Sequence, residues 1–204
     1  LQSLRVVDEL EQRYADFPGL NLTYETREGI LKHCSAKNAR GLGELGVRFL
    51  ERSQPGLEAQ IANVADAIAY NHHDVNDGLR AGLLDLDELV EVGLFGEVFS
   101  AGAAGYPAAP RKRQVSETVR RMIDTVVTDL LQTTRENLAE LQAADIDGIR
   151  AAGRPMLSFS ARIQGLHTEL KQYLHGRLYR HHRVLRMTRK ARRVVTELFA
   201  VYME

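Results

Sequence analysis

The segment "NVADAIAYNHHDVNDG" brings carboxylates, imidazoles and a phenol together within residues 63–78. Asp66, Tyr70 and Asp74 recur every four residues, so they would share one face of a helix. Two more polar residues fall on that face, His73 and Asp77. The spacing suits a metal ligand, a ring that positions a sugar, and a carboxylate that accepts hydrogen bonds.

The opposite face of this predicted helix is apolar. It carries Leu57, Ile61, Val64, Ile68, Val75 and Leu79. A solvated face usually holds Lys, Arg and Glu, but residues 59–79 contain none of them. The stretch "NHHDVNDG" also consists of poor helix formers. Poor helix formers within a helix are expected where function overrides stability, which favours a functional face. A solvated face remains open as the alternative interpretation.

Helical periodicity runs through most of the chain and predicts an all-α fold. Helices are predicted over residues 1–14, about 23–33 after a Thr23 cap, about 57–80 after Ser53, Pro55 and Gly56, about 85–99 begun by Asp85 or Asp87, 114–143, 160–180 and about 184–203. Turns or irregular segments are predicted at 17–21, at the glycine-rich 35–47 and at 153–159.

The small-residue segment "SAGAAGYPAAP", residues 100–110, is the clearest predicted break. Residues 1–100 hold 9 Lys and Arg against 17 Asp and Glu, a net charge of −8. Residues 101–204 hold 18 against 10, a net charge of +8. An acidic half and a basic half fit a site that binds a cation together with a polyanion, and they also fit two solvated faces of unlike sign.

Candidate phosphate ligands gather near the start of the 114–143 helix, where a helix N-terminus also favours anions. They are Arg111, Lys112, Arg113, Arg120 and Arg121. Lys32 is a further candidate. Residues 171–193 hold nine Lys and Arg and no acid, which fits a nucleotide, nucleic acid, an acidic partner subunit or solvent. Tyr173 and Tyr179 are the only Phe, Tyr or Trp residues in that basic segment, so base stacking is weakly supported and nucleic acid is not favoured.

The single cysteine, Cys34, excludes an internal disulfide and fits a reducing compartment, which predicts a cytoplasmic protein. No run of about 18 apolar residues is present, so no membrane span or membrane partner is predicted. The sequence begins without methionine and already in helical periodicity. We therefore expect it to start inside a larger protein.

Similarity to a known family runs through four blocks: "GLNLTYETREGILKH" (19–33), "PGLEAQIANVADAIAYNHHDVNDGLRAGLL" (55–84), "KRQVSETVRRMIDTVVTDLL" (112–131) and "LYRHHRVLRMTRKARRVVTELF" (178–199). They resemble the bacterial deoxyguanosinetriphosphate triphosphohydrolase-like proteins of the HD-domain superfamily. The resemblance implies a multi-helix HD-domain-like bundle. It makes residues 1–100 the C-terminal part of the catalytic domain and residues 111–204 a helical region packed on it.

In that family one metal ion is held by a His, a His-Asp pair and a more distant Asp. The resemblance matches Asp66 to the distant Asp, Tyr70 to a tyrosine that packs against the deoxyribose, and Asp74 to an acid that shapes the sugar pocket. The family's His-Asp pair lies upstream of this chain, so His73 and Asp74 are not that pair. The resemblance gives no firm match for His73 or Asp77.

The resemblance implies hydrolysis of a deoxynucleoside triphosphate to a deoxynucleoside and tripolyphosphate. It also implies a divalent cation, Mg²⁺ or Mn²⁺ with Fe²⁺ or Zn²⁺ as further options, and a homo-oligomer. The predicted metal ligand is Asp66, and the predicted substrate-binding residues are Tyr70, His73, Asp74, Lys112 and Arg113. Catalytic residues are expected upstream of Leu1, so the 204 residues alone are predicted to be inactive or nearly so.

Two other functions remain open. One is a nucleotidase or phosphodiesterase of the same superfamily. The other is a non-catalytic helical module that binds nucleotides or nucleic acid and regulates. A His followed by a His-Asp pair upstream of Leu1 would favour catalysis, and its absence would favour the regulatory module.

Overall fold

The computed structural model describes residues 1–203, apart from the side chain of Ala103. The predicted all-α class is confirmed, because every regular element in this range is a helix. The chain forms two compact units. The first unit is Leu1–Ala67 with Thr128–Ser160, and the second unit is Ile68–Val127 with Ala161–Glu204. The predicted division at residues 100–110 into two domains stays a prediction.

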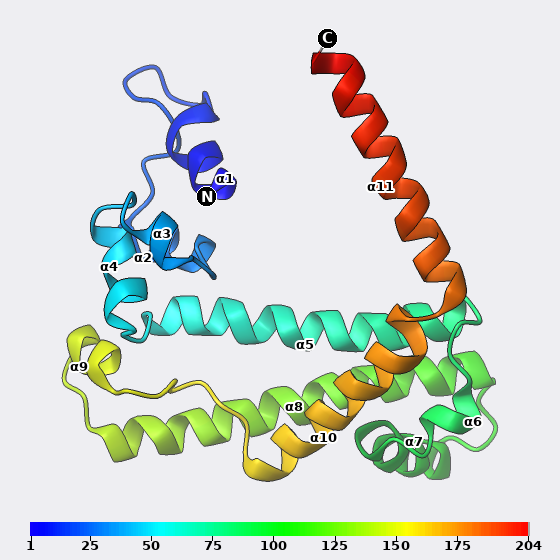
Figure 1. Cartoon of the computed structure of the whole chain (residues 1–204). Helices are drawn as coiled ribbons and strands as arrows, with labels where there is room; N and C mark the ends of the chain where they lie inside the picture. The colour runs from blue at the N-terminus through cyan, green and yellow to red at the C-terminus, as the bar shows by residue number, and fades with distance from the viewer. Residues whose placement is uncertain (204) are drawn as a thin grey trace. The chain divides into compact units, whose positions relative to one another are not determined.

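Short helices make up most of the first unit (Figure 1). They are α1 (Gln2–Arg5), the π-helical turn η1 (Val6–Leu10), α2 (Tyr24–Ile30), α3 (Ala36–Ala39), α4 (Glu44–Glu51) and α9 (Ile146–Ala151). The start of α5 (Leu57–Arg80) and the end of α8 (Arg111–Leu141) complete it. A small core of Leu4, Leu31 and Leu45 joins α1 to the later helices, with Tyr24 and Phe49 packed against it.

The second unit carries the larger buried side chains. It contains the rest of α5 and of α8 with α6 (Leu86–Leu89), α7 (Gly93–Gly105), α10 (Ala161–Leu174), the π-helical turn η2 (His175–Tyr179) and α11 (His182–Met203). Val75, Phe95, Met122, Leu170 and Leu174 are almost completely buried, so each of α5, α7, α8 and α10 contributes to this core.

Capping residues place several helix starts where the sequence predicts them. The Thr23 side chain accepts a hydrogen bond from the Thr26 amide at 3.4 Å, and α2 begins at Tyr24. Asp85 accepts from the amides of Asp87 and Glu88 at 2.8 and 3.2 Å, which begins α6. These oxygens satisfy amides that have no partner within the helix.

Several predicted boundaries are wrong. The helix expected over 1–14 ends at Leu10, because Glu11 is extended. The helix expected over 85–99 is two helices, α6 and α7, and α7 continues through Gly105 into the predicted loop. Alanine has the highest helix propensity, so "AGAAG" extends α7 despite its glycines.

Three further differences concern short or misjudged elements. The segment 35–47 is not irregular, since it holds α3, capped by Ser35, and the start of α4. Helix α9 was not predicted, and Asp145 caps it by accepting from the Gly148 amide at 3.0 Å. Helix α8 begins at Arg111 and not at residue 114, and the Pro110 carbonyl accepts its first hydrogen bonds, from the amides of Arg113 and Gln114 at 2.8 and 3.1 Å.

The predicted bounds of α5 are confirmed. Of its predicted apolar face, Ile68 and Val75 are buried, but Ile61 is 53% exposed, so that part of the prediction is wrong. Three polar residues of α5, Gln60, Asn71 and His72, are buried instead. Their hydrogen bonds replace part of the apolar packing that the pattern predicts.

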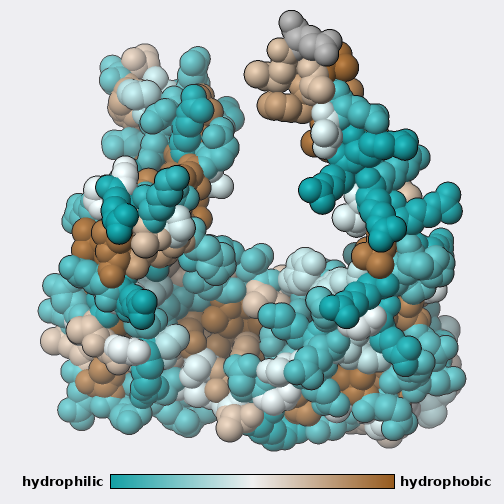
Figure 2. All heavy atoms as spheres, viewed as in Figure 1, coloured by the Kyte–Doolittle hydropathy of each residue, from teal (hydrophilic) through white to brown (hydrophobic). Residues whose placement is uncertain are grey.

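Helix α11 buries none of its described side chains. In Figure 1 it extends away from α6, α7 and α10 of the same unit. Polar residues dominate its earlier turns, and apolar surface gathers toward its C-terminal end (Figure 2). The exposed apolar side chains there include Val195, Leu198, Phe199 and Tyr202. Within residues 1–203, no helix combines the length and apolar character needed to cross a membrane.

Candidate functional site

The polar side chains predicted to share one face of α5 are exposed or half-buried. The boundary between the units falls after Ala67, so Asp66 belongs to the first unit, and Tyr70, His73, Asp74 and Asp77 belong to the second. The side chain of Asp66 is 73% exposed and Tyr70 is 59% exposed. His73 and Asp77 are exposed as well, whereas Asp74 is half-buried. Their functional roles stay predictions.

In the first unit, Asp66 forms an ion pair with Lys32. The Lys32 ammonium donates to Asp66 Oδ2 at 3.1 Å. Lys32 follows the end of α2, and the Lys32 amide donates to the Ile30 carbonyl at 3.1 Å. Lys32, which was predicted only as a further phosphate ligand, therefore lies beside the predicted metal ligand Asp66.

The side chains of residues 1–203 do not form a complete site for a divalent cation. No cluster of three or more His, Cys, Asp or Glu among residues 1–203 has the arrangement of a metal site. Asp66 brings a single carboxylate, and Lys32 occupies one of its oxygens. One ligand gives a metal ion little affinity, so the residues present do not fit a complete metal centre.

In the second unit, Tyr179 links the π-helical turn η2 to α5. Its hydroxyl donates a short hydrogen bond to Asp74 Oδ2. The rings of Tyr179 and Tyr70 lie with their centroids 6.0 Å apart and their planes at 45°. The His175 ring meets the Tyr179 ring edge-on, with the centroids 6.2 Å apart and the planes at 78°. A carboxylate, two phenols and an imidazole are thus brought together, and π-helical turns are frequent at functional sites.

Burial raises the pKa of Tyr179, and the neighbouring Asp74 carboxylate raises it further. The phenol therefore stays protonated near neutral pH and donates to Asp74. One Asp74 oxygen is held in this way, which fixes the carboxylate. Its other oxygen has no hydrogen bond to another described residue and can accept one from a ligand hydroxyl.

Tyr179 was not predicted as a site residue. It lies 105 positions from Asp74 and belongs to no spacing pattern on α5. The sequence shows it only as one of two aromatic residues in a basic segment. The sole available signal is its place in the fourth block of family resemblance, "LYRHHRVLRMTRKARRVVTELF".

The two histidines before Asp74 differ in their surroundings. His73 is exposed, as its position on the polar face predicts. His72 is fully buried, and its Nδ1 lies 2.6 Å from the Ile68 carbonyl oxygen. Beside it, the Asn71 amide nitrogen lies 2.8 Å from His167 Nε2. Asn71 and His167 therefore form a buried polar link between α5 and α10, whereas the hydrogen bond of His72 stays within α5.

The basic candidates at the start of α8 lie at the surface. Arg111 pairs with Asp87 at 3.2 Å, and both Arg120 and Arg121 pair with Glu117. Lys112 and Arg113, the two predicted substrate ligands, are exposed. Neither of their side chains makes a hydrogen bond or ion pair with Tyr70, His73 or Asp74 in the described part of the chain, so the structure does not bring these two sets together.

Comparisons with known proteins agree with the resemblance. Residues 157–204 match the family described as "Phosphohydrolase-associated domain". A protein of Bordetella pertussis named deoxyguanosinetriphosphate triphosphohydrolase-like protein is 55% identical over 203 residues, which cover 100% of this chain and 53% of that protein. Proteins with the same name from Thiobacillus denitrificans and Nitrosomonas europaea are 52% and 47% identical, covering 99% of this chain and 54% of each relative. The chain thus spans about half the length of the curated relatives that it matches. Over its whole length it is homologous to the deoxyguanosinetriphosphate triphosphohydrolase-like family.

Proposed function

We propose that this chain is part of a hydrolase that cleaves deoxynucleoside triphosphates to a deoxynucleoside and tripolyphosphate. The observation that carries the proposal is the cluster of Tyr70, Asp74 and Tyr179 in the second unit. A half-exposed ring beside a fixed carboxylate suits a deoxyribose. The ring can pack on the sugar, and the carboxylate can accept a hydrogen bond from a hydroxyl of the sugar. The names of the homologues support the same substrate class.

Asp66 and Lys32 supply charge in the first unit. We infer that Asp66 is one ligand of a divalent cation whose other ligands are not among these 204 residues. A cation that binds Asp66 would compete with the Lys32 ammonium, 3.1 Å from Oδ2. Lys32 would then be free to bind an anionic phosphate oxygen, which a lysine recognises as a point charge.

The cation is proposed to be Mg²⁺ or Mn²⁺, with Fe²⁺ or Zn²⁺ as further options, because carboxylate and imidazole ligands suit all four. Lys112 and His73 stay predicted substrate ligands, and Arg113 stays a predicted phosphate ligand. A homo-oligomeric state and a cytoplasmic location likewise stay predictions. The 204 residues alone are expected to show little or no activity, since they bring one predicted metal ligand.

The test is release of tripolyphosphate from each of the four deoxynucleoside triphosphates by the full-length protein that carries this chain, with Mg²⁺ or Mn²⁺. We expect Asp66→Ala to abolish release, and Lys32→Gln to reduce kcat/KM at least tenfold. The exposed Lys32–Asp66 pair contributes less than about 1 kcal/mol to stability. Lys32→Gln should therefore leave the melting temperature nearly unchanged, which separates a functional role from a structural one.

Asp77→Ala is the matched control for Asp66→Ala. Both aspartates lie on α5, with side chains 71% and 73% exposed, and Asp77 has no assigned role. Activity that survives Asp66→Ala would contradict the proposed ligand. No release from any deoxynucleoside triphosphate, with metal and mixed nucleotides present, would reject the substrate class and favour the non-catalytic regulatory module.

A further inference from the structure

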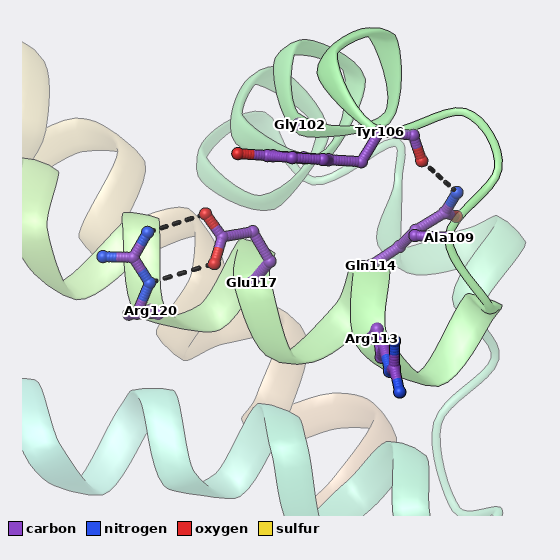
Figure 3. Close-up of a pocket in the computed structure, with 7 residues that line it drawn as sticks. All are labelled: Gly102, Tyr106, Ala109, Arg113, Gln114, Glu117 and Arg120. Atoms are coloured by element: carbon purple, nitrogen blue, oxygen red, sulfur yellow. Dashed lines mark hydrogen bonds and ion pairs between the residues drawn. The ribbon is translucent and has the colours of Figure 1, made fainter.

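A hollow of about 390 Å³ lies in the second unit, between the end of α7 and the start of α8. Tyr106 forms its upper wall in Figure 3, and Gln114, Glu117 and Arg120 of α8 lie beneath the ring. Binding sites for small molecules span about 300–1,000 Å³, so the hollow has room for one small molecule.

The hollow lies away from the buried side of α8. Its three charged lining residues are Arg113, Glu117 and Arg120. They lie roughly 140–180° around the helix from the buried Met122. The side chains of the hollow are therefore not part of the unit's core, and packing does not explain their types.

An aromatic surface is open on one side of the hollow. Tyr106 is 55% exposed, and its backbone carbonyl accepts a hydrogen bond from the Gln114 side-chain amide at 3.4 Å. A methyl group added at Gly102 or Gly105 would meet no atom within 4 Å, so the space along this end of α7 is empty. The guanidinium carbon of Arg121 lies 5.8 Å from the centroid of the Tyr106 ring, so a flat ring would stack on the face of Tyr106 that Arg121 leaves open.

Positive charge is held beneath the ring. Glu117 accepts hydrogen bonds from Arg120 Nε at 3.0 Å and NH2 at 2.6 Å, and from Arg121 Nε at 2.7 Å. The hydrogen bond from Arg120, followed by that from Arg121, lowers the pKa of Glu117 to about 2. This group of three therefore keeps one net positive charge, and its guanidinium groups are held in place with N–H donors to spare.

Arg113 adds a second positive charge. Within the described part of the chain its guanidinium makes no hydrogen bond or ion pair, and Figure 3 shows it directed away from Tyr106. A long flexible side chain of this kind can turn toward a bound anion without breaking an existing ion pair. The hollow thus joins an exposed aromatic ring to cationic groups that have unused donors.

We propose that this hollow binds a planar ring that carries a phosphate, as in a nucleoside monophosphate. The ring stacks on Tyr106, and the phosphate binds the guanidinium groups of Arg113 and Arg120. Arginine recognises phosphate through paired N–H donors, and an aromatic side chain accepts any flat base. This site is separate from the Tyr70, Asp74 and Tyr179 cluster and adds a second ligand to the proposed function.

The test is calorimetric titration of the 204-residue chain with deoxyguanosine monophosphate, which carries no triphosphate to be released. We expect saturable binding that Tyr106→Ala weakens at least fivefold and Tyr106→Phe leaves within twofold. Tyr14→Ala is the matched control, because Tyr14 is 56% exposed and lies in the first unit. It should leave the affinity within twofold of the wild type.

The phosphate contribution is tested separately. Deoxyguanosine and inorganic phosphate should each bind at least fivefold more weakly than the monophosphate. Arg113→Gln should weaken binding of the monophosphate at least fivefold. Arg135→Gln is its control, since Arg135 is an exposed arginine of α8 that makes no ion pair with another described residue. An equal loss of affinity in Arg113→Gln and Arg135→Gln would show that only the net charge of the protein matters, and it would overturn the proposal.

Tyr70→Ala distinguishes the hollow from the α5 face. Binding that persists in Tyr70→Ala and weakens in Tyr106→Ala would support the proposal. The reverse pattern, or no heat of binding at millimolar nucleotide, would overturn it. Neither result bears on tripolyphosphate release by the full-length protein, so this inference and the proposed function can fail independently.

Discussion

The Tyr179 hydroxyl donates to the Asp74 carboxylate across 105 positions of sequence, and this hydrogen bond ties the turn after α10 to α5. The phenol is more buried than the neighbouring Tyr70, which leaves its own ring half open. One tyrosine of the pair thus fixes the carboxylate while the other presents a surface. The two roles can be separated by substitution.

Tyr179→Phe keeps the ring and removes the donor. Hydrogen bonds to charged groups contribute about 1.5–3 kcal/mol, and this one is only part-buried, so we expect the free energy of unfolding to fall by about 1–2 kcal/mol. In the full-length protein, KM for the deoxynucleoside triphosphate should rise more than kcat falls, since Asp74 loses its orientation. Urea denaturation and steady-state kinetics measure the two effects.

Tyr173→Phe is the control for this substitution. The Tyr173 hydroxyl is buried and has no hydrogen-bond partner in the described part of the chain. Its removal should leave stability unchanged or raise it, because an unsatisfied buried group is lost. Equal destabilisation by both variants would show that the Asp74 hydrogen bond contributes nothing of its own.

Glu28→Gln should strongly destabilise the first unit. Glu28 is buried, accepts from the Gly56 amide at 3.1 Å, and pairs with Arg48 at 3.2 Å and Arg150 at 3.8 Å. Removing one partner of a buried ion pair costs about 3–5 kcal/mol, because the remaining charge is left uncompensated. Thermal and urea unfolding would measure the loss.

Glu25→Gln is the matched control, on the same helix. Glu25 is only half-buried and makes no ion pair with another described residue. Its substitution should change stability by less than about 0.5 kcal/mol. A loss of similar size in both variants would mean that the charge of α2, and not the buried network, is responsible.

Acid should loosen the contact between α5 and α10. Burial lowers the pKa of both His72 and His167 below the usual 6.5, and each is lowered further by a neighbouring histidine. A lowered pKa in the folded state means that the stabilising contribution is present above pH 6.5 and is lost as pH falls through the folded values. Hydrogen exchange of α10 amides should therefore accelerate between pH 7.5 and 5.5, after correction for the intrinsic exchange rate.

His72→Leu should reduce this pH dependence, because one of the two buried imidazoles is removed. His33→Leu serves as the control at an exposed position and should leave the dependence as it is in the wild type. An unchanged pH dependence in His72→Leu would exclude that imidazole as the cause.

Gly96→Ala and Gly102→Ala should have opposite effects although both lie within α7. A Cβ at Gly96 would come within 2.0 Å of the Val90 carbonyl oxygen, whereas one at Gly102 would meet nothing within 4 Å. We expect Gly96→Ala to destabilise the second unit by about 1–3 kcal/mol through overpacking. Gly102→Ala should stabilise it by up to about 1 kcal/mol through helix propensity. Melting temperatures that move in the same direction would contradict this.

Local signals predict the long elements and the exposed face of α5. Pro55 and Gly56 before a long periodic run place the start of α5 at Leu57, and the capping residues Thr23 and Asp85 mark two further helices. The polar residues predicted to share one face of α5 are exposed or half-buried as the pattern requires. These predictions rest on contacts within a few residues of each other.

Long-range contacts account for what the sequence did not predict. The partnership of Tyr179 with Asp74 depends on how α10 and η2 return to α5, which no spacing on α5 reveals. His72 lies buried because Ile68 supplies a carbonyl within the same helix, a feature that hydrophobic periodicity does not register. Ile61 remains exposed for a reason that the contacts do not explain.

Helix α11 is stabilised by other interactions than the remaining helices of the second unit. Because it buries no side chain, tertiary packing adds almost nothing to its stability, and the helix depends on its own propensities and on i,i+4 pairs such as Arg193 with Glu197. Its 22 residues should therefore behave as a tethered peptide in a helix–coil equilibrium. On warming, their helicity would decline gradually, while the core of the second unit unfolds in a single cooperative step at higher temperature.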